Sequence, residues 1–313
     1  MARTSLHGKL VAVVGGSGFI GRHLAQELLA RGARLRVISR NVERANGIKP
    51  LGSLGQVQLL RGDVRKADEL AALLAGADAA VNLAGTFAGD LDAVMGSGAG
   101  AVAQAARNAG VQAMVHVSAI GADAGGETAY ARAKAAGEVA VLAAFPKATV
   151  LRPSVLFGPD DMFINRFAGL IARFPVMPVF APQARFQPVL VDDVALAIAN
   201  ALGDPAEHGG KTYELAGPDQ LTMAELNRRI AAAAHRSPLF LDLPDGVSGL
   251  FVALTGWLPG APISGQQWKL LKTGNVASGT LPGLRELGVQ PRPLGLFLDR
   301  WLVRFRKHGR FGE

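Results

Sequence analysis

Residues 10–21 read LVAVVGGSGFIG, an apolar run that leads directly into three glycines spaced as GxxGxxG. The run predicts a buried strand, and the apolar periodicity of residues 19–30 predicts a helix after the glycines. Glycines in such a turn let the backbone approach a pyrophosphate, and the helix N-terminus adds N–H groups and a favourable dipole. Three glycines are weak evidence in a chain that has 39, but the strand–turn–helix setting is specific. It predicts a dinucleotide site that contains Gly15, Ser17, Gly18, Phe19, Ile20 and Gly21.

The first half of the chain continues this pattern, because short apolar runs alternate with helix-like segments. Such alternation is typical of a parallel sheet covered by helices. It predicts an α/β fold, a doubly wound parallel sheet (the Rossmann fold), for residues 1–152. The expected strands are 10–14, 35–38, 57–60, 79–83, 113–117 and 149–151, and the expected helices are 19–30, 67–74, 98–108 and 130–144.

Beyond residue 152 the pattern is broken by prolines between residues 159 and 188. A helix at 193–202, a strand at 212–215 and a helix at 223–234 follow. We expect residues 153–290 to form a smaller C-terminal lobe on the carboxyl edge of the sheet, which contributes to the substrate side. Residues 291–313 read as a basic amphipathic tail.

The tail has an apolar stripe at helical spacing and a basic opposite face. Such a helix is typical of one that lies on an anionic membrane surface or binds a partner protein, here through residues 293–310. A terminal helix packed on its own domain, with solvated arginines, is the other interpretation, and both stay open. The stripe is Leu294, Phe297, Leu298, Trp301, Leu302 and Phe305, and the basic residues are Arg300, Arg304, Arg306, Lys307 and Arg310.

Composition excludes several classes of site. The chain has no cysteine, so it has no disulfide, no thiolate metal site and no cysteine nucleophile. Its six histidines lack the spacing of metal ligands, and we expect no metal. The net charge of +8 indicates an anionic partner or a basic surface with no specific partner. Without a recognised module or aromatics among the basic residues, no nucleic-acid partner is expected.

We expect a cytoplasmic location, because the first strand begins by Lys9 and leaves no room for a targeting peptide. No run approaches the roughly 18 apolar residues of a transmembrane helix.

The end of the second strand predicts the nucleotide preference. An acidic residue there usually holds the ribose hydroxyls of NAD, but this chain has Ser39 and Arg40. These side chains can bind a 2′-phosphate that a carboxylate would repel, so NADP(H) is preferred and NAD(H) is the alternative.

Two further strand ends complete the expected cofactor contacts. After the third strand, Asp63 can accept from the adenine amino group while Val64 packs on the ring; capping of the next helix is the other role open to Asp63. The fourth strand ends at Leu83, Ala84 and Gly85, whose small side chains let the cofactor pass.

Tyr130 and Lys134 lie four residues apart on a predicted helix and therefore on one face. The ammonium can then lie near both the phenol and the nicotinamide ribose. A nearby cation stabilises phenolate, so we expect a lowered pKa for Tyr130, as proton exchange with a hydroxyl or carbonyl requires.

These motifs, in this order, resemble the extended and atypical short-chain dehydrogenases/reductases. The likeness covers about residues 9–235 and continues through residues 152–158 and 189–195. It implies that Tyr130 and Lys134 are catalytic and that the backbone of Pro153 and Val155 meets the nicotinamide carboxamide.

The likeness fails where the family has a serine or threonine that polarises the substrate. Ala119 and Ile120 stand there, and the nearest hydroxyl is that of Ser118. Whether Ser118 acts on the substrate, contacts the cofactor or serves structure stays open.

Within that family the chain is most similar to the NAD(P)H-binding accessory subunits of respiratory complex I and their bacterial relatives. The similarity lies in residues 51–57, 116–118, 135–138, 145–146, 157–161 and 163–167. It implies a structural nucleotide and docking on complex I subunits, peripherally on the cytoplasmic face of the inner membrane. The alternative is an active NADPH-dependent reductase, dehydrogenase or epimerase that uses Tyr130 and Lys134 in quinone or lipid metabolism. The sequence does not decide whether the chain is an enzyme.

Overall fold

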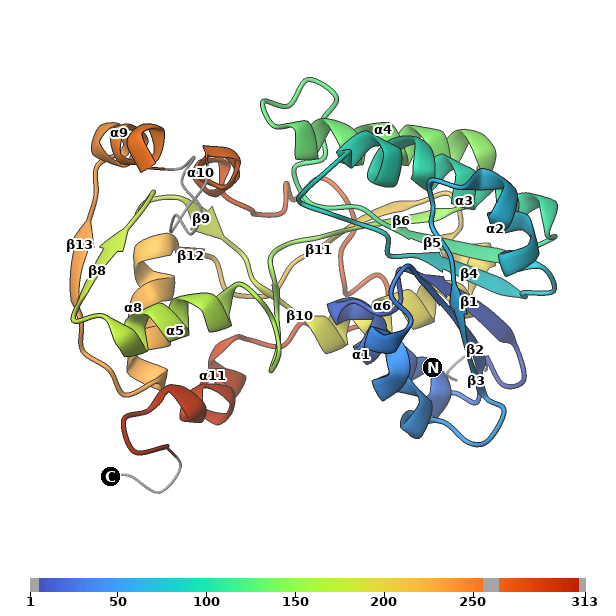
Figure 1. The fold of residues 1–313 in the computed structure, drawn as a ribbon, viewed down its shortest axis with the longest axis horizontal. Helices are drawn as coiled ribbons and strands as arrows, with labels where there is room; N and C mark the ends of the chain where they lie inside the picture. The colour runs from blue at the N-terminus through green and yellow to red at the C-terminus, as the bar shows by residue number, and fades with distance from the viewer. Residues whose placement is uncertain (1–5, 256–264, 310–313) are drawn as a thin grey trace. The chain divides into compact units, whose positions relative to one another are not determined.

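The computed structural model describes residues 6–255 and 265–309, and the chain divides into two compact units (Figure 1). Unit 1 consists of Met1–Pro153, Val191–Leu215 and Ser278–Gln290. Unit 2 consists of Ser154–Leu190, Ala216–Ala277 and Pro291–Glu313. This division differs from the predicted ranges, because parts of the expected lobe at 153–290 belong to unit 1 and the tail at 291–313 belongs to unit 2.

Unit 1 is built on a parallel sheet of seven strands in the order β11-β6-β5-β4-β1-β2-β3. The run from β3 to β6 has the order 3-2-1-4-5-6 of a dinucleotide-binding Rossmann sheet, so the predicted fold class is confirmed. The strand order reverses between β1 and β4, which is where such sheets bind ligands. The strands are β1 (Leu10–Val14), β2 (Arg34–Ser39), β3 (Val57–Arg61), β4 (Ala79–Asn82), β5 (Ala113–Val117), β6 (Thr149–Pro153) and β11 (Thr212–Leu215).

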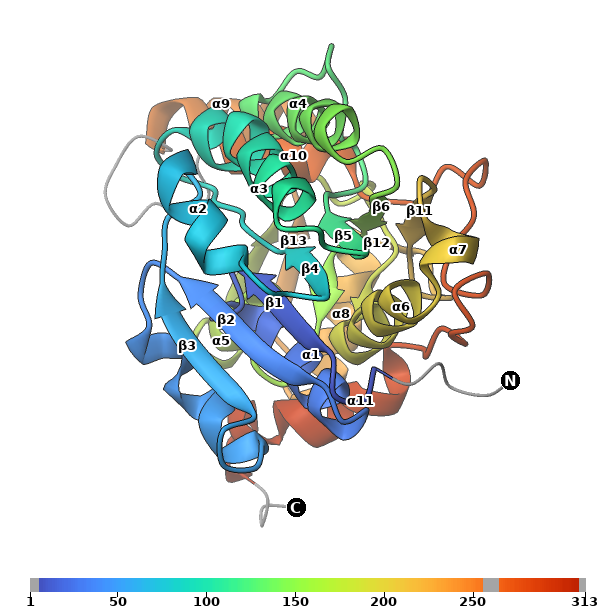
Figure 2. The same ribbon diagram turned by 90° about the vertical axis from the view of Figure 1, so that its right-hand side faces the viewer.

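Helices cover both faces of this sheet, as Figure 2 shows in an end-on view. One face carries α1 (Phe19–Ala30) and α6 (Val191–Gly203), and the other carries α2 (Ala67–Leu74), α3 (Ser97–Asn108) and α4 (Ala129–Ala144). Short helical turns also occur at η1 (Glu43–Leu51), η2 (Asp92–Gly96) and α7 (Pro205–His208).

The strand expected at 212–215 forms as β11, but it extends the main sheet instead of the smaller lobe. It pairs in parallel with β6, with Thr212 opposite Val150. The longer helix that precedes it in the chain, α6, is held to α1 by a 2.5 Å contact between His23 Nδ1 and Asp192 Oδ1. These contacts join residues more than 60 positions apart, which a local pattern does not reveal.

Small residues let α4 pack closely on η2 and α3. A Cβ added at Gly137 of α4 would overlap the carbonyl oxygen of Met95, which lies in the π-helical turn η2. One turn further on, a Cβ at Gly100 would lie 2.8 Å from the Cβ of Ala140. Gly137 follows Lys134 by one helical turn, so this packing also fixes the position of Lys134 along the sheet.

The substitution Gly137→Ala should therefore destabilise unit 1 by about 1–3 kcal/mol, because η2 has to move away from α4. The free energy of unfolding from urea titration measures the loss. Gly47→Ala is the matched control, since nothing lies within 4 Å of a Cβ added at Gly47. Equal stability of the two variants would show that the α4–η2 contact is not tight.

Unit 2 contains three two-stranded ribbons with helices packed beside them. Its helices are α5 (Ile164–Arg173), α8 (Met223–Ala233), α9 (Asp245–Thr255), α10 (Gly265–Thr273), α11 (Gly295–Trp301) and η3 (Leu302–Phe305). The ribbons pair β7 (Leu156–Phe157) with β10 (Val189–Leu190), β9 (Arg185–Phe186) with β12 (Leu221–Thr222), and β8 (Val176–Val179) with β13 (Leu239–Asp242). None of the helices in the described part of the chain is long and apolar enough to span a bilayer.

The apolar stripe of the tail packs on unit 2. Leu294, Leu298 and Leu302 are at most 4 % exposed and join the core formed by α5 and α8. The ring centroids of Trp301 and Phe157 are 6.0 Å apart. Of the two interpretations of the tail, the structure therefore shows packing on its own domain, which leaves the stripe unavailable to a membrane.

Some basic residues of the tail also make internal contacts. Arg304 donates to the carbonyl of Pro159 (2.9 Å), and Arg306 donates to the carbonyl of Ala233 (3.2 Å). Arg300 and Lys307 are exposed, and Arg310 lies outside the described residues.

Candidate dinucleotide-binding site

The three glycines of the first turn are required for different reasons. Gly15 has a φ of +79°, and a Cβ there would lie 2.8 Å from the backbone nitrogen of Ala84. A Cβ at Gly21 would overlap the carbonyl oxygen of Gly16. At Gly18 the nearest such atom is 3.5 Å away, so this side of the turn is open. Gly15 and Gly21 serve close packing, whereas Gly18, directly before Phe19 and Ile20, leaves open space. That a pyrophosphate occupies this space stays a prediction.

The structure brings Ser17 and Ser39 together. Their hydroxyl oxygens are 2.6 Å apart, which ties the glycine turn to the end of β2. The Ser39 hydroxyl also accepts from the backbone N–H of Asn41 (3.3 Å). Arg40, between them in the chain, is exposed. Two hydroxyls therefore meet beside the glycine turn, and an exposed arginine follows them in the chain.

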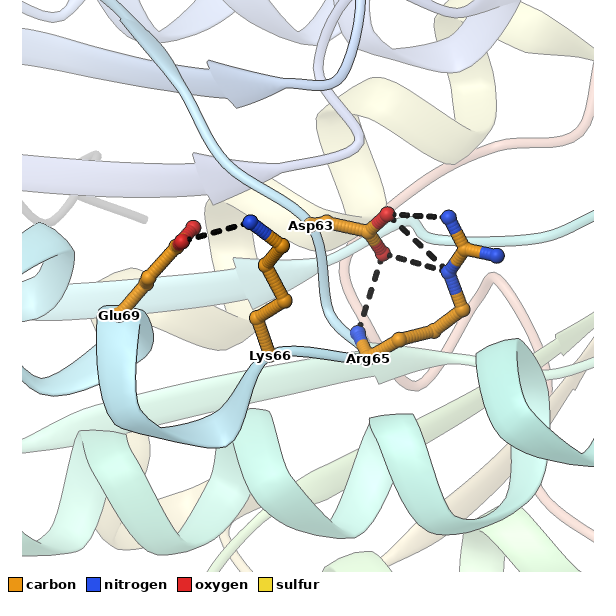
Figure 3. Close-up of polar contacts among 4 residues, drawn as sticks. All are labelled: Asp63, Arg65, Lys66 and Glu69. Carbon is orange, nitrogen blue, oxygen red and sulfur yellow. Dashed lines mark hydrogen bonds and ion pairs between the residues drawn. The ribbon is translucent and has the colours of Figure 1, made fainter.

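Asp63 after β3 is clamped by Arg65 (Figure 3). Arg65 Nε donates to both carboxylate oxygens at 3.0 Å, and Arg65 Nη2 donates to Oδ2 at 2.5 Å. These charge-assisted bonds lower the pKa of Asp63 to about 2. Sequence reasoning missed Arg65, although an acid and an arginine two positions apart after a strand were a visible signal.

The clamp bears on the two roles considered for Asp63. The N-cap position of α2 is Lys66 and not Asp63. Lys66 makes no side-chain capping bond, and its ammonium donates to Glu69 at 2.8 Å (Figure 3). Capping by Asp63 is therefore wrong, and acceptance from adenine stays a prediction. Val64 is 8 % exposed and lies in the core, where a Cβ at Gly98 would meet it at 3.0 Å.

A buried amide organises the turn after β4. Asn82 Oδ1 accepts from the backbone N–H of Ala84 (3.0 Å), so the Asn82 amide nitrogen faces His116 Nδ1, 3.3 Å away. His116 Nδ1 is then the acceptor, and the neutral ring carries its proton on Nε2. Burial and the charge of Lys134 lower the pKa of His116 to about 3, which keeps the ring neutral. This turn carries Leu83, Ala84 and Gly85.

Lys134 is placed by α4 and deeply buried. The hydroxyl of Thr128 accepts from the N–H of Ala131 (3.1 Å) and starts the helix. The Lys134 ammonium donates to the carbonyl of Val117 (3.0 Å), and a Cβ at Gly85 would lie 3.9 Å from it. Burial lowers the pKa of Lys134 to about 8, against an opposite effect of Glu138.

Tyr130 does not have the lowered pKa that the Tyr/Lys spacing led us to expect. Burial raises its pKa to about 12, because the phenolate would lose solvation. The ring stacks on Phe87 with centroids 4.8 Å apart and planes at 13°. The expectation was wrong because it counted the charge of Lys134 and not the burial of the phenol.

Ser118 lies at the end of β5, where its backbone N–H donates to the carbonyl of Leu151 (2.7 Å). Its hydroxyl and His116 Nε2 are buried, and neither finds a hydrogen-bond partner in the described part of the chain. Buried polar atoms of this kind normally bond a ligand or an ordered water. Together with the open side of Gly18, they fit a site that a bound dinucleotide completes.

Pro153 and Val155 fall on opposite sides of the division between the units. The Pro153 carbonyl, in unit 1, accepts from the N–H of Ile120 (3.0 Å). The Val155 carbonyl, in unit 2, accepts from the N–H of Val189 (2.9 Å). Their contact with nicotinamide stays a prediction.

The sheet order and the glycine turn at the reversal point define a Rossmann protein of the dinucleotide-binding kind. Residues 15–162 match a family model described as NAD(P)H-binding.

The chain is 31 % identical to NADH dehydrogenase (ubiquinone) 1 alpha subcomplex subunit 9, mitochondrial, of Arabidopsis thaliana, over 98 % of this chain and 80 % of that protein. It is also 33 % identical to a ceramide reductase of Caulobacter vibrioides, over 75 % of this chain and 74 % of that protein. The chain belongs to this NAD(P)H-binding family, so the resemblance inferred from the motifs is confirmed.

Solved structures agree on the fold. Triphenylmethane reductase of Citrobacter sp., complexed with NADP(H), superposes with a TM-score of 0.72 at 23 % identity. The match covers 91 % of this chain and 97 % of that chain.

The substitution Gly18→Val should abolish dinucleotide binding without unfolding the protein. The backbone at Gly18 (φ −80°, ψ −176°) is extended and suits valine, whose methyl groups would fill the open side of the turn. Isothermal titration with NADPH and a thermal melt measure the two effects. The control Gly21→Ala should behave oppositely and lose stability first. Binding by Gly18→Val at wild-type affinity would mean that the pyrophosphate lies elsewhere.

Proposed function

We propose that this protein is an NADP(H)-binding accessory subunit of a respiratory NADH:ubiquinone oxidoreductase and holds its nucleotide as a structural component. The observation that carries the proposal is the state of Tyr130. Its phenol is stacked beneath Phe87 with a pKa raised to about 12, and Ala119 and Ile120 occupy the positions where a polarising hydroxyl is needed. General acid–base catalysis is most efficient when the pKa of the transferring group lies near the operating pH. The similarity to subunit 9 supports the same role.

The proposed nucleotide is NADP(H) rather than NAD(H). Ser17 and Ser39 form a hydroxyl pair at the end of β2, and the next residue, Arg40, is exposed. The charge of Arg40 contributes to the low pKa of Asp63, so the two side chains are near each other. A 2′-phosphate placed here gains a charge-assisted bond.

The variant Arg40→Ala should bind NADPH more weakly by about 1.5–3 kcal/mol and NADH almost as well as wild type, because only NADPH loses a phosphate contact. Competitive titrations of both nucleotides give the ratio of dissociation constants. Arg44→Ala, one helical turn beyond, is the control. A parent protein that prefers NADH, or equal losses for both nucleotides, would contradict the preference.

The proposed place of the protein is peripheral, on the cytoplasmic face of the membrane that carries the complex. Unit 2 has 14 Lys and Arg against 8 Asp and Glu, so it holds most of the net charge of +8. Because the stripe of the tail is internal, docking through residues 293–310 relies on exposed basic side chains such as Arg300 and Lys307. They suit acidic patches on partner subunits or anionic lipid headgroups.

A second candidate is an active NADPH-dependent reductase of an apolar carbonyl, either a lipid ketone or a quinone. The Tyr130/Lys134 pair is intact, and a relative of similar identity is a ceramide reductase. Bound NADPH would supply the hydride for such a reduction, and Tyr130 would supply a proton to the carbonyl oxygen. Lys134 and Ser118 orient the ribose and the carbonyl.

Tyr130→Phe separates the two candidates, because it keeps the ring and removes the transferable proton. A structural nucleotide predicts that Tyr130→Phe retains NADPH through purification and supports assembly of the complex in cells. Lys134→Ala, which loses a ribose contact, should then be the more damaging change. Native gels of membranes and the nucleotide content of the purified variants provide the readouts. A cellular defect of Tyr130→Phe equal to deletion, with NADPH still bound, would favour the reductase.

A further inference from the structure

Phe87 is an exposed aromatic side chain at the reacting end of the site. It lies five residues beyond the end of β4, and 77 % of its surface is exposed. One face of its ring stacks on Tyr130, with centroids 4.8 Å apart. Gly85, two residues earlier, lies beside the Lys134 ammonium. Phe87 therefore contacts Tyr130, and the same loop passes Lys134 at Gly85.

The loop that carries Phe87 is built to hold it. The Thr86 hydroxyl donates to the carbonyl of Ala88 (2.8 Å) and accepts from the backbone N–H of Ala88 (3.1 Å). Gly89 follows with a φ of +77°, a conformation that favours glycine. Asp90 then accepts from the N–H of Ala93 (2.9 Å) at the start of η2. Bonds on both sides of Phe87 fix its backbone, so its exposure follows from the structure of the loop.

The stack with Tyr130 uses only one face of the Phe87 ring. Aromatic rings prefer offset stacked or edge contacts at centroid distances of about 4.5–7 Å, and a second flat ring can add to the same stack. A single exposed apolar side chain needs no explanation by itself. Phe87 differs from such a residue in two ways. Its ring is stacked on Tyr130, and hydrogen bonds within the loop hold its backbone.

We propose that Phe87 is a ligand-binding residue whose free face stacks a flat conjugated ring, with Tyr130 as the support beneath it. Two sources of that ring fit: the nicotinamide of the bound dinucleotide, or a separate quinone-type molecule. The proposal concerns binding at the site of the proposed function and does not require hydride transfer.

Binding of two probes to the full chain tests the proposal: NADPH, and menadione added to the NADPH-loaded protein. The variants are Phe87→Ala, which removes the ring, and Phe87→Trp, which restores a larger one. Leu54→Ala is the matched control, because Leu54 is a fully exposed apolar residue of unit 1.

We expect Phe87→Ala to weaken one probe by roughly three- to tenfold, as loss of one stacking contact implies, and Phe87→Trp to restore it. A loss confined to menadione identifies a separate ring, and a loss confined to NADPH identifies nicotinamide. The proposal is overturned if Phe87→Ala binds both NADPH and menadione with wild-type affinity. It is overturned as well if Phe87→Ala binds NADPH with wild-type affinity and neither the wild-type protein nor any variant binds menadione. It is also overturned if Leu54→Ala causes the same loss. Retention of NADPH by every variant would leave the proposed nucleotide role intact, so the two failures are distinguishable.

Discussion

The site of unit 1 depends on how closely the backbone of β1 approaches that of β4 at the reversal point of the sheet. Gly15 adopts a left-handed conformation directly against Ala84, with no room for a single methyl group between them. That approach aims the glycine turn at the carboxyl edge of the sheet and starts α1 there. It also places the turn after β4 beside Lys134. Widening the contact would move the glycine turn away from the turn after β4 and from Lys134.

Charge in the interior of this site is controlled by burial. His116 is held neutral by desolvation, and the Asn82 amide fixes which ring nitrogen carries the proton. Lys134 then remains as the cation beside the β4 turn, with its ammonium on the Val117 carbonyl and its pKa near 8. A small change in local polarity can therefore charge or neutralise it. An ammonium in this place has further N–H groups that can donate to the ribose hydroxyls of a nucleotide.

Much of unit 1 could be predicted because its signals are local. The apolar run at 10–14, the glycine turn and the helix at 19–30 each depend on neighbouring residues, and they form where the sequence predicts. The place of β11 in the sheet could not be predicted, because the sequence pattern of a strand does not identify the strand with which it pairs. Asp63 and Arg65 stand two positions apart in the sequence, but this pair matches no known motif, so their contact was not predicted.

Burial explains the other two differences between the sequence predictions and the structure. The tail has the periodicity of a surface-binding helix, yet its stripe lies in the core of unit 2, and no local pattern distinguishes those two environments. The prediction of a lowered pKa for Tyr130 was wrong for the same reason. The spacing of residues shows which charges lie near the phenol, but it does not show how much solvent the phenol loses on folding.

The division of unit 1 into three chain segments has a consequence for biosynthesis. When residue 153 leaves the ribosome, six strands of the sheet exist but β6 has an open edge, and α6 is missing from the face beside α1. About 60 further residues must be made before β11 can pair with β6, which takes roughly 3–12 s at ordinary rates of translation. During that time the nascent chain presents an unpaired apolar strand, a state in which chaperones bind and edge-to-edge aggregation begins. The interleaved order of the two units thus gives this protein a period of vulnerability that a contiguous N-terminal domain would avoid.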